Sequence, residues 1–360
     1  MDIGIIGLSG VGKTSFFNLL TGGKADAGYG GGRGQANMGM GRVPDPRIDR
    51  LSAVFQPKKT TYATIRFIDV AGLQPSTQGE RRTGDFLNDI RNVDCLVHVV
   101  RGFASDVVPH VAGSIDPLRD LELIHNELLL TDWGFVETRL EKLAKERVKN
   151  PNLAKEEPIL RRCMEALEEG RPLSTVDLSE DEEKLMAGYT FFTRKPMIIV
   201  VNLDEDQLQS GEYPNQSQVQ EWCRDHALPL IEVSAQVELE ISQLDEADRD
   251  LFMEEYGLKE TGIARLARTA YSHLGLISFF TVGQDEVRAW TVRDGATAQE
   301  AGGKIHSDIA RGFIRAEVCS YADFIEHGSM AALKEKGLLR LEGKDYKVKD
   351  ADIMTFRFNV

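Results

Sequence analysis

The sequence lacks several features that would assign it directly to a class of protein. It has four cysteines, Cys95, Cys163, Cys223 and Cys319, and no two of them are spaced as a CxxC redox or zinc motif. No run approaches the ~18 apolar residues of a membrane-spanning helix, and the first residues do not form a signal peptide. These absences predict reduced thiols, no membrane partner and a cytoplasmic protein.

An excess of positive charge is also missing. The formal net charge is -14, and long-range repulsion would oppose docking of the whole chain on nucleic acid, so no DNA partner is expected. One stretch near the C-terminus is nevertheless basic. It is interpreted either as solvated charge or as an RNA-facing patch, and its residues are Lys334, Lys336, Arg340, Lys344, Lys347 and Lys349.

What the sequence does contain begins with a phosphate-binding motif. Residues 3–6 predict a buried strand, residues 14–20 predict a helix, and Gly7-Leu-Ser-Gly-Val-Gly-Lys-Thr14 between them fits GxxxxGKS/T. The glycines let the backbone wrap a phosphate, and the helix N-terminus adds partial positive charge. We expect Lys13 to bridge the β- and γ-phosphates and Thr14 to bind Mg²⁺. The expected nucleotide contacts of this loop are Ser9, Gly10, Val11, Gly12, Lys13, Thr14 and Ser15.

A second motif begins where the run of residues 64–69 ends in an acid. Asp69 at the end of a strand can hold Mg²⁺. The motif Asp69-Val-Ala-Gly72 would let the Gly72 amide contact the γ-phosphate, and loss of that phosphate would release the loop. The pair of motifs is typical of a switch nucleoside triphosphatase.

The residue that usually orients the attacking water is missing. Many switch proteins place a glutamine after this glycine, whereas this chain has Leu73, which cannot hydrogen-bond through its side chain. Slow hydrolysis is therefore expected, unless another group holds the water. The catalytic candidates are Gln74 and His110, together with Lys13.

A third motif follows the apolar run 197–201. Guanine-specific switches carry Asn-Lys-x-Asp here, whereas this chain has Asn202-Leu-Asp-Glu205. The longer glutamate collides with or overreaches the two donors of guanine, and adenine has neither donor, so guanine selection weakens and adenine is permitted. Asn202 can still reach the N7 side of either purine. The expected base site comprises Asn202, Leu203, Glu205 and the strand tail Ser234-Ala235.

These motifs resemble those of YchF-type ATPases of the Obg-related group. The shared features are Asn-x-x-Glu, the apolar residue in place of the glutamine, and a C-terminal run from Val287-Arg-Ala-Trp-Thr-Val to Phe356-Arg-Phe-Asn-Val360. The resemblance spans nearly the whole chain. It implies ATP preferred over GTP, dependence on Mg²⁺, association with the ribosome or ribosomal RNA, and a C-terminal TGS-like module.

Two segments depart from the family pattern. The family usually has Pro-Asn where this phosphate loop has Ser9-Gly10. Residues 28–41 are half glycine where an Asn-Tyr-Pro-Phe-x-Thr motif is usual, and no Thr or Ser lies between Lys24 and Arg42. The usual switch hydroxyl for Mg²⁺ is therefore missing. This absence argues against normal switching and turnover, although not against nucleotide binding.

The predicted fold class is α/β, with an inserted arm and a small second domain. We expect a P-loop nucleotide-binding domain at 1–117 and 193–275, a helical arm at 118–192, and an α+β domain of β-grasp, TGS-like type at 276–360. In the last domain, the expected helix is 297–311 and the expected strands are 277–282, 287–292, 346–348 and 354–358. The arm is interpreted either as a solvated hairpin or as a partner-docking element.

The motifs therefore favour a ribosome-associated switch that hydrolyses ATP, and GTP less well, with Mg²⁺. Two alternatives stay open: a GTP-preferring GTPase of the Obg group, and a nucleotide-sensing ribosome or RNA adaptor that barely turns over. A metabolic kinase fits poorly, because it would need an acceptor site and a lid.

Overall fold

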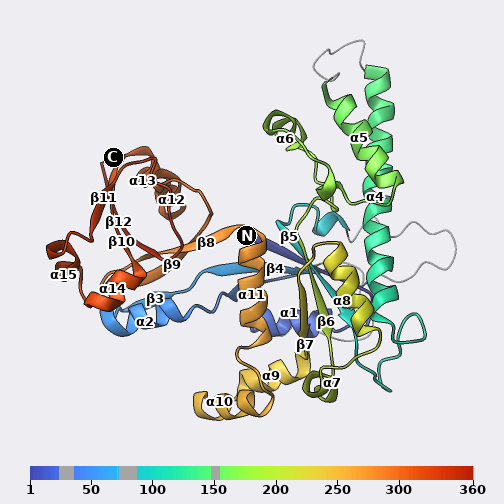
Figure 1. Cartoon of the computed structure of the whole chain (residues 1–360), viewed down its shortest axis with the longest axis horizontal. Helices are drawn as coiled ribbons and strands as arrows, with labels where there is room; N and C mark the ends of the chain where they lie inside the picture. Colours follow the sequence, from blue (N-terminus) through green and yellow to red (C-terminus); the bar gives the residue numbers. More distant parts are fainter. Residues whose placement is uncertain (24–35, 71, 73–86, 147–154, 360) are drawn as a thin grey trace. The chain divides into compact units, whose positions relative to one another are not determined.

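The computed structural model describes residues 1–23, 36–70, 72, 87–146 and 155–359 of the chain. They form two compact units. The first comprises Met1–Met40 with Arg66–Ile263, and the second comprises Gly41–Ile65 with Ala264–Val360. Each unit has a six-stranded sheet and helices of its own (Figure 1). None of the described helices is both long enough and apolar enough to cross a membrane.

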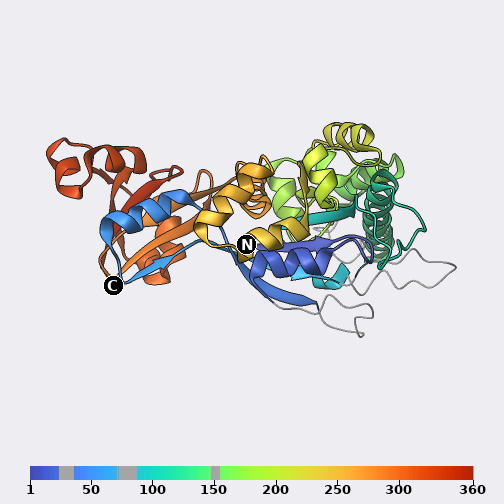
Figure 2. The same ribbon diagram turned by 90° about the horizontal axis from the view of Figure 1, so that it is seen from below.

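The sheet of the first unit has the strand order β2-β4-β1-β5-β6-β7. Neighbouring strands from β4 to β7 pair in parallel. Strands β5 and β6 are buried along their whole length, because helices lie above and below the sheet (Figure 2). The strands are β1 Asp2–Ile6, β2 Asn37–Arg42, β4 Thr64–Asp69, β5 Cys95–Arg101, β6 Met197–Asn202 and β7 Leu230–Val233. The predicted P-loop fold is confirmed.

The helices of the first unit connect these strands. Helix α1 follows directly from the phosphate loop and packs against β1 and α9. In a parallel sheet the carboxyl ends of the strands meet at one edge, so the loops after β1, β4 and β6 lie close together. The helices are α1 Lys13–Thr21, α7 Glu205–Ser210, α8 Gln216–Asp225, α9 Ala235–Gln243 and α10 Glu246–Glu255.

A helical arm projects from this unit between β5 and β6. The 30-residue helix α4 is Pro117–Glu146, and α5 Glu156–Glu168 packs along it (Figure 1). The 3-10 helix η2 Leu173–Thr175 and helix α6 Glu180–Met186 complete the arm, which has its own apolar core. The prediction of helices in this segment is confirmed.

Buried Asp132 of α4 fixes the base of the arm. Its carboxylate accepts hydrogen bonds from Phe192 N at 3.0 Å, from Thr193 N at 2.7 Å and from Thr193 Oγ1 at 2.8 Å. Burial raises the pKa of Asp132, and the three hydrogen bonds oppose that rise. The arm is therefore joined to the chain just before β6.

The second unit has a mixed sheet with the order β11-β10-β12-β8-β9-β3. Strands β10 and β12 pair antiparallel, as do β8 and β9, whereas β12 and β8 are parallel. The strands are β3 Lys59–Thr61, β8 Leu276–Thr281, β9 Glu286–Arg293, β10 Phe313–Ser320, β11 Arg340–Glu342 and β12 Asp352–Phe358. The helices are α2 Pro46–Phe55, α11 Gly262–His273, α12 Ala298–Ile305, α13 Ser307–Arg311, α14 Tyr321–His327 and α15 Met330–Glu335.

Several details of this unit differ from the sequence prediction. The expected helix 297–311 is two helices, because His306 adopts an extended backbone and caps α13 with its ring. The expected strand 346–348 is wrong, since Lys347 forms only an isolated bridge with Thr297. Strands β10 and β11 were not predicted. Most of β10 pairs with β12 and buries Ala316 and Val318 in the core.

Residues 41–65 were assigned to the nucleotide-binding domain, and the structure instead groups most of them, including α2 and β3, with the C-terminal residues. Strand β3 extends the second sheet by pairing in parallel with β9. The ring of Phe55 at the end of α2 stacks on Phe324, with centroids 5.2 Å apart. Long-range pairing of this kind leaves no local pattern in the sequence. The predicted boundary between nucleotide domain and arm stays a prediction.

Candidate nucleotide-binding site

The phosphate loop connects β1 to α1 in a conformation that depends on glycine. Gly10 and Gly12 have φ values of 77° and 93°, in the left-handed region that other residues rarely adopt. A Cβ atom on Gly12 would lie 2.4 Å from Asn202 Nδ2. Gly12 is also the N-cap of α1 and provides no side-chain cap, which leaves the first helical amides available to an anion.

Lys13 lies buried against this loop. Its Nζ donates a hydrogen bond to the carbonyl oxygen of Leu8 at 2.8 Å, so the ammonium folds back across the loop. Burial lowers the pKa of Lys13 to about 8, partly opposed by the negative charge of Asp69. An anion beside Nζ would raise that pKa again, because opposite charge favours the protonated amine. The predicted position of Lys13 in the loop is thus suited to a phosphate.

Thr14 and Asp69 lie together, as expected for a metal site. Thr14 Oγ1 donates to Asp69 Oδ2 at 2.9 Å, and Asn37 Nδ2 donates to the same oxygen at 3.3 Å. The other oxygen, Oδ1, is buried without a hydrogen-bond partner among the described residues. A hydroxyl beside a carboxylate with an unpartnered oxygen suits Mg²⁺ or a water bound to it.

Asn37 was not predicted as a site residue. It begins β2, inside the glycine-rich segment 28–41, and its amide reaches Asp69 although it is distant in sequence. The absence of a hydroxyl between Lys24 and Arg42 had pointed away from this interval. An amide side chain at the start of the strand was the signal that could have identified Asn37, because amide oxygens also bind Mg²⁺ and its waters.

Gly72 of the second motif lies against the phosphate loop. A Cβ atom there would come within 2.6 Å of Ser9 Cα and 2.7 Å of Lys13 Nζ. The structure therefore brings the first two motifs together. Leu73 and Gln74 lie outside the described residues, so the role predicted for Gln74 stays a prediction.

His110, the other catalytic candidate, is bound within the chain. Its Nε2 lies 2.8 Å from Asp120 Oδ2, and both side chains are nearly inaccessible. Ala112 N donates to the other ring nitrogen, Nδ1, at 3.1 Å. Both nitrogens thus have protein neighbours in this conformation. A role for His110 in holding water stays a prediction, and it requires the ring to exchange one of these neighbours.

Arg101 lies beneath the phosphate loop and was also missed. It ends β5 and is buried, with Nη1 donating to Gly10 O at 3.4 Å and Nε donating to Phe103 O at 3.0 Å. The guanidinium stacks over the Phe103 ring, 4.3 Å from its centroid. Its signal was a cation at the end of a strand that is apolar apart from His98. It adds positive charge under the loop.

Asn202 connects the phosphate loop to the base motifs. Its Nδ2 donates to Val11 O at 3.0 Å, and Ala235 N donates to its Oδ1 at 3.0 Å. Asn202 is buried, and within the part of the chain that the structure describes its amide donates one of its two N–H groups, to Val11. Three predicted site segments are therefore joined by one side chain. Contact of Asn202 with a purine stays a prediction.

The other base-site candidates are engaged by protein groups. Leu203 is buried, and a Cβ atom on Gly102 would lie 2.7 Å from its Cδ2. The Ser234 hydroxyl caps α9 by accepting from Val237 N. Glu205 begins α7, and its carboxylate accepts a hydrogen bond from the Tyr256 hydroxyl. Their contacts with nucleotide stay predictions.

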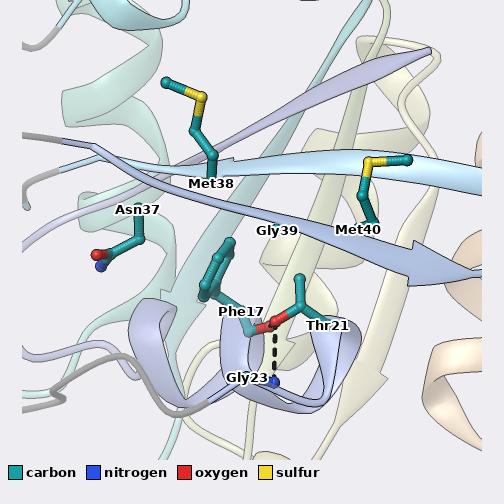
Figure 3. A pocket seen from close by; sticks show the side chains of 7 residues that line it. All are labelled: Phe17, Thr21, Gly23, Asn37, Met38, Gly39 and Met40. Carbon is teal, nitrogen blue, oxygen red and sulfur yellow. Dashed lines mark hydrogen bonds between the residues drawn. The ribbon is translucent and has the colours of Figure 1, made fainter.

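A separate shallow pocket of about 240 Å³ lies between α1 and β2 (Figure 3). Phe17 and Thr21 of α1 line one side, and the side chains of Met38 and Met40 point away from α1. It shares Asn37 with the metal-site residues. The pocket adjoins the nucleotide site and is not part of the phosphate loop.

The parallel sheet, the phosphate loop and the metal-site pair define a P-loop nucleotide-binding protein. Two family models match the chain: "50S ribosome-binding GTPase" over residues 2–131, and the YchF-GTPase_C model, described as "Protein of unknown function", over residues 276–359. The chain belongs to the YchF family.

Its similarity to relatives spans the full length. It is 41% identical to the "Ribosome-binding ATPase YchF" of Bacillus subtilis (strain 168), covering 100% of both chains. It is 40% identical to the protein of the same name from Escherichia coli O157:H7, covering 99% of both. The solved structure of the Schizosaccharomyces pombe YchF GTPase superposes with a TM-score of 0.87 at 29% identity, over 99% of this chain and 97% of that one.

Proposed function

We propose that the chain is a cytoplasmic, Mg²⁺-dependent ATPase that acts as a nucleotide-dependent switch on the ribosome. One observation supports the hydrolase part of this proposal. Lys13, the pair Thr14 and Asp69, and Gly72 all lie beside the phosphate loop. The ribosome as partner is supported by the printed names of the relatives, which match over the full length.

In this proposal the residues of the phosphate loop bind and orient the triphosphate. Lys13 exchanges the Leu8 carbonyl for phosphate oxygens, and the amides after Gly12 hold the β-phosphate. Thr14 Oγ1 and the free oxygen of Asp69 would hold Mg²⁺, which supplies charge neutralisation between phosphates when it is bound. Gly72 would report the γ-phosphate, because it already lies against Ser9.

Water positioning falls to His110 or Gln74 in this proposal. His110 beside Asp120 resembles a general pattern in which a carboxylate orients an imidazole. The arrangement supports slow turnover, because the ring must leave or turn from Asp120 before it can hold a water for attack.

Preference for ATP over GTP follows from the base motif. Glu205 replaces the aspartate that accepts from guanine, and its carboxylate is engaged by Tyr256. Leu203, buried, replaces the lysine whose stem covers guanine. We expect GTP to bind as a secondary substrate through the same phosphate contacts.

The charge distribution suggests which unit would contact ribosomal RNA. The second unit has 19 basic and 15 acidic residues, whereas the first has 24 basic and 42 acidic residues. Phosphate groups repel the first unit and attract the second. We therefore propose that the C-terminal, TGS-like part contacts RNA, and that the acidic arm contacts protein if it contacts the ribosome at all.

A phosphate-release assay with Mg²⁺-ATP, with and without ribosomes, tests the enzyme proposal. Release should exceed that of a Lys13→Ala variant, whose loop lacks the ammonium. If wild type and variant release phosphate equally slowly in both conditions, the second candidate function, a nearly non-hydrolysing adaptor, takes its place. That candidate is favoured by Leu73 and by the burial of the His110 side chain beside Asp120.

Co-sedimentation with ribosomes tests the partner. The full chain should sediment with ribosomes, and a variant with Lys334, Lys344 and Lys349 changed to glutamate should sediment less and lose its salt dependence. Equal sedimentation of both proteins would remove the RNA contact from the C-terminal unit.

A further inference from the structure

The Glu205 carboxylate stands at the position where guanine-specific switches carry their selecting aspartate, and it already has a hydrogen-bond donor. The hydroxyl of Tyr256 donates to Glu205 Oε1 across 51 positions of sequence. Glu205 is the first residue of α7, and Tyr256 is the C-cap of α10. The bond therefore joins two helices at the same end of the first unit (Figure 1).

The ring of Tyr256 packs against a neighbouring aromatic residue, and its hydrogen bond to Glu205 lies at the surface. The phenol ring stacks on Phe252 of α10, with centroids 4.7 Å apart and an angle of 22° between the planes. Helix α10 packs on α9, which starts at Ala235, and Ala235 N donates to Asn202. The donor is thus built on the same framework as the other base-site residues.

A carboxylate at this position discriminates between purines when it is free. It can only accept hydrogen bonds, and guanine offers two donors, N1–H and the 2-amino group. Adenine presents an acceptor at N1 and no 2-amino group, so a free carboxylate there favours guanine and repels adenine. The extra methylene of glutamate adds a rotatable bond, so length alone does not keep the carboxylate from folding back onto guanine.

We propose that Tyr256 is a specificity-determining residue that keeps the Glu205 carboxylate from selecting guanine. Hydrogen bonds to a charged acceptor are stronger than neutral ones, so the phenol both fixes the direction of the carboxylate and occupies part of its accepting capacity. The inference rests on the proposed function, since it concerns the base of the same nucleotide. It assigns the purine preference to a pair of residues, of which only Glu205 lies in a recognisable motif.

Calorimetric titration of the full chain and of a Tyr256→Phe variant with Mg²⁺-ATP and Mg²⁺-GTP tests this. Phenylalanine keeps the stack on Phe252 and removes only the hydroxyl. The affinity for GTP should rise about tenfold in the variant, while that for ATP stays within about twofold, because only guanine gains from a released carboxylate.

Two further variants keep the test falsifiable. Combined with Tyr256→Phe, Glu205→Gln should cancel the gain in GTP affinity, because no carboxylate is then released. Tyr189→Phe is the matched control, because it removes another tyrosine hydroxyl that donates to a glutamate, Glu156 of the arm. It should leave the ratio unchanged.

The possible outcomes distinguish a failure of the role of Tyr256 from a failure of the proposed function on which it rests. A wild-type chain that binds GTP more tightly than ATP would overturn the proposed ATP preference. A wild-type chain that prefers ATP, with the same ratio in Tyr256→Phe and Tyr189→Phe, would overturn the role of Tyr256 alone. A gain in GTP affinity that persists with Glu205→Gln would also contradict it, since no carboxylate would then be released.

Discussion

The candidate site has a phosphate half, made of the phosphate loop, Asp69 and Gly72, and a base half, made of Asn202, Leu203, Glu205 and Ser234-Ala235. The two halves differ in whether their polar groups are already bonded to other protein groups. Among the residues that the structure describes, Asp69 Oδ1 in the phosphate half has no hydrogen-bond partner, and Lys13 Nζ donates to the Leu8 carbonyl, which a phosphate can replace. In the base half, Glu205, Ser234 and Asn202 already bind protein groups. We therefore expect phosphate binding to depend on contacts that a ligand can replace, and the choice of base to depend on contacts that the protein makes with itself.

Of the changes considered, removing the negative charge of Asp69 in the phosphate half should reduce hydrolysis most. Asp69→Asn keeps the shape of the side chain and its contact with Thr14, and removes the negative charge. Hydrolysis should fall about 1,000-fold, and Mg²⁺ should no longer tighten ATP binding. Phosphate release and titration at two Mg²⁺ concentrations measure this. Exposed Asp89→Asn is the control, and equal loss in both variants would contradict the metal-site assignment.

The second largest effect is expected from a change in the conformation of the phosphate loop. Gly12→Ala places a Cβ 2.4 Å from Asn202 Nδ2 at a φ of 93°, whereas Gly22→Ala at a φ of 61° meets no atom within 4 Å. Gly22→Ala should cost only about 1 kcal/mol of stability through the left-handed backbone. Gly12→Ala should in addition lower ATP affinity about 100-fold, because Asn202 must move. Equal affinities of the two variants would show that the close approach does not matter.

The link between the halves is Asn202. Asn202→Ala removes the hydrogen bonds to Val11 and from Ala235, leaving both buried groups without that partner. We expect ATP and GTP affinity to fall together by about 30-fold, since the change acts through the phosphate loop. A loss confined to one nucleotide would make Asn202 a base-reading residue instead.

A smaller effect is expected from acid, which should lower the free energy of unfolding through a histidine near the phosphate half. His98 of β5 pairs in register with Ile6, just before the loop, and burial lowers the pKa of His98 to about 3, with minor contributions from His125 and Lys13. The unfolded chain therefore binds a proton below pH 6.5 that the folded chain does not. Stability should fall as pH drops, by about 1.4 kcal/mol between pH 7.5 and pH 5.5 for this group.

Urea midpoints at several pH values measure that slope. The slope should become smaller in a His98→Gln variant, even if that variant is less stable at every pH. An unchanged slope would mean that other groups, such as His125, whose pKa burial lowers to about 4, dominate the acid response.

The sequence predicted which residues of the phosphate loop and of the Asp69 motif lie together, because these motifs are contiguous, and their contacts with nucleotide stay predictions. A glycine loop between a strand and a helix specifies its own shape, and Asp69 and Gly72 are placed by the strand that precedes them. Asn37 and Arg101 were missed because each reaches the site from another strand. The same holds for Tyr256, whose contact with Glu205 depends on how two helices pack.

The fold shows the same division. The buried parallel strands were predicted from continuous apolar runs, since a strand covered on both faces is apolar throughout. Residues 41–65 were misassigned because the pairing of β3 with β9 joins positions more than half the chain apart. Such pairing is decided by packing between distant segments, which spacing alone does not reveal.

The most direct test of the account is calorimetric titration of nucleotide-free chain with ATP and with GTP, each with Mg²⁺. The account predicts tighter binding of ATP, with Mg²⁺ strengthening both, because the phosphate half binds any triphosphate and the base half does not select guanine. Tighter binding of GTP would contradict it, and the chain would then be a GTPase whose base site Asn202-Leu-Asp-Glu205 does not describe.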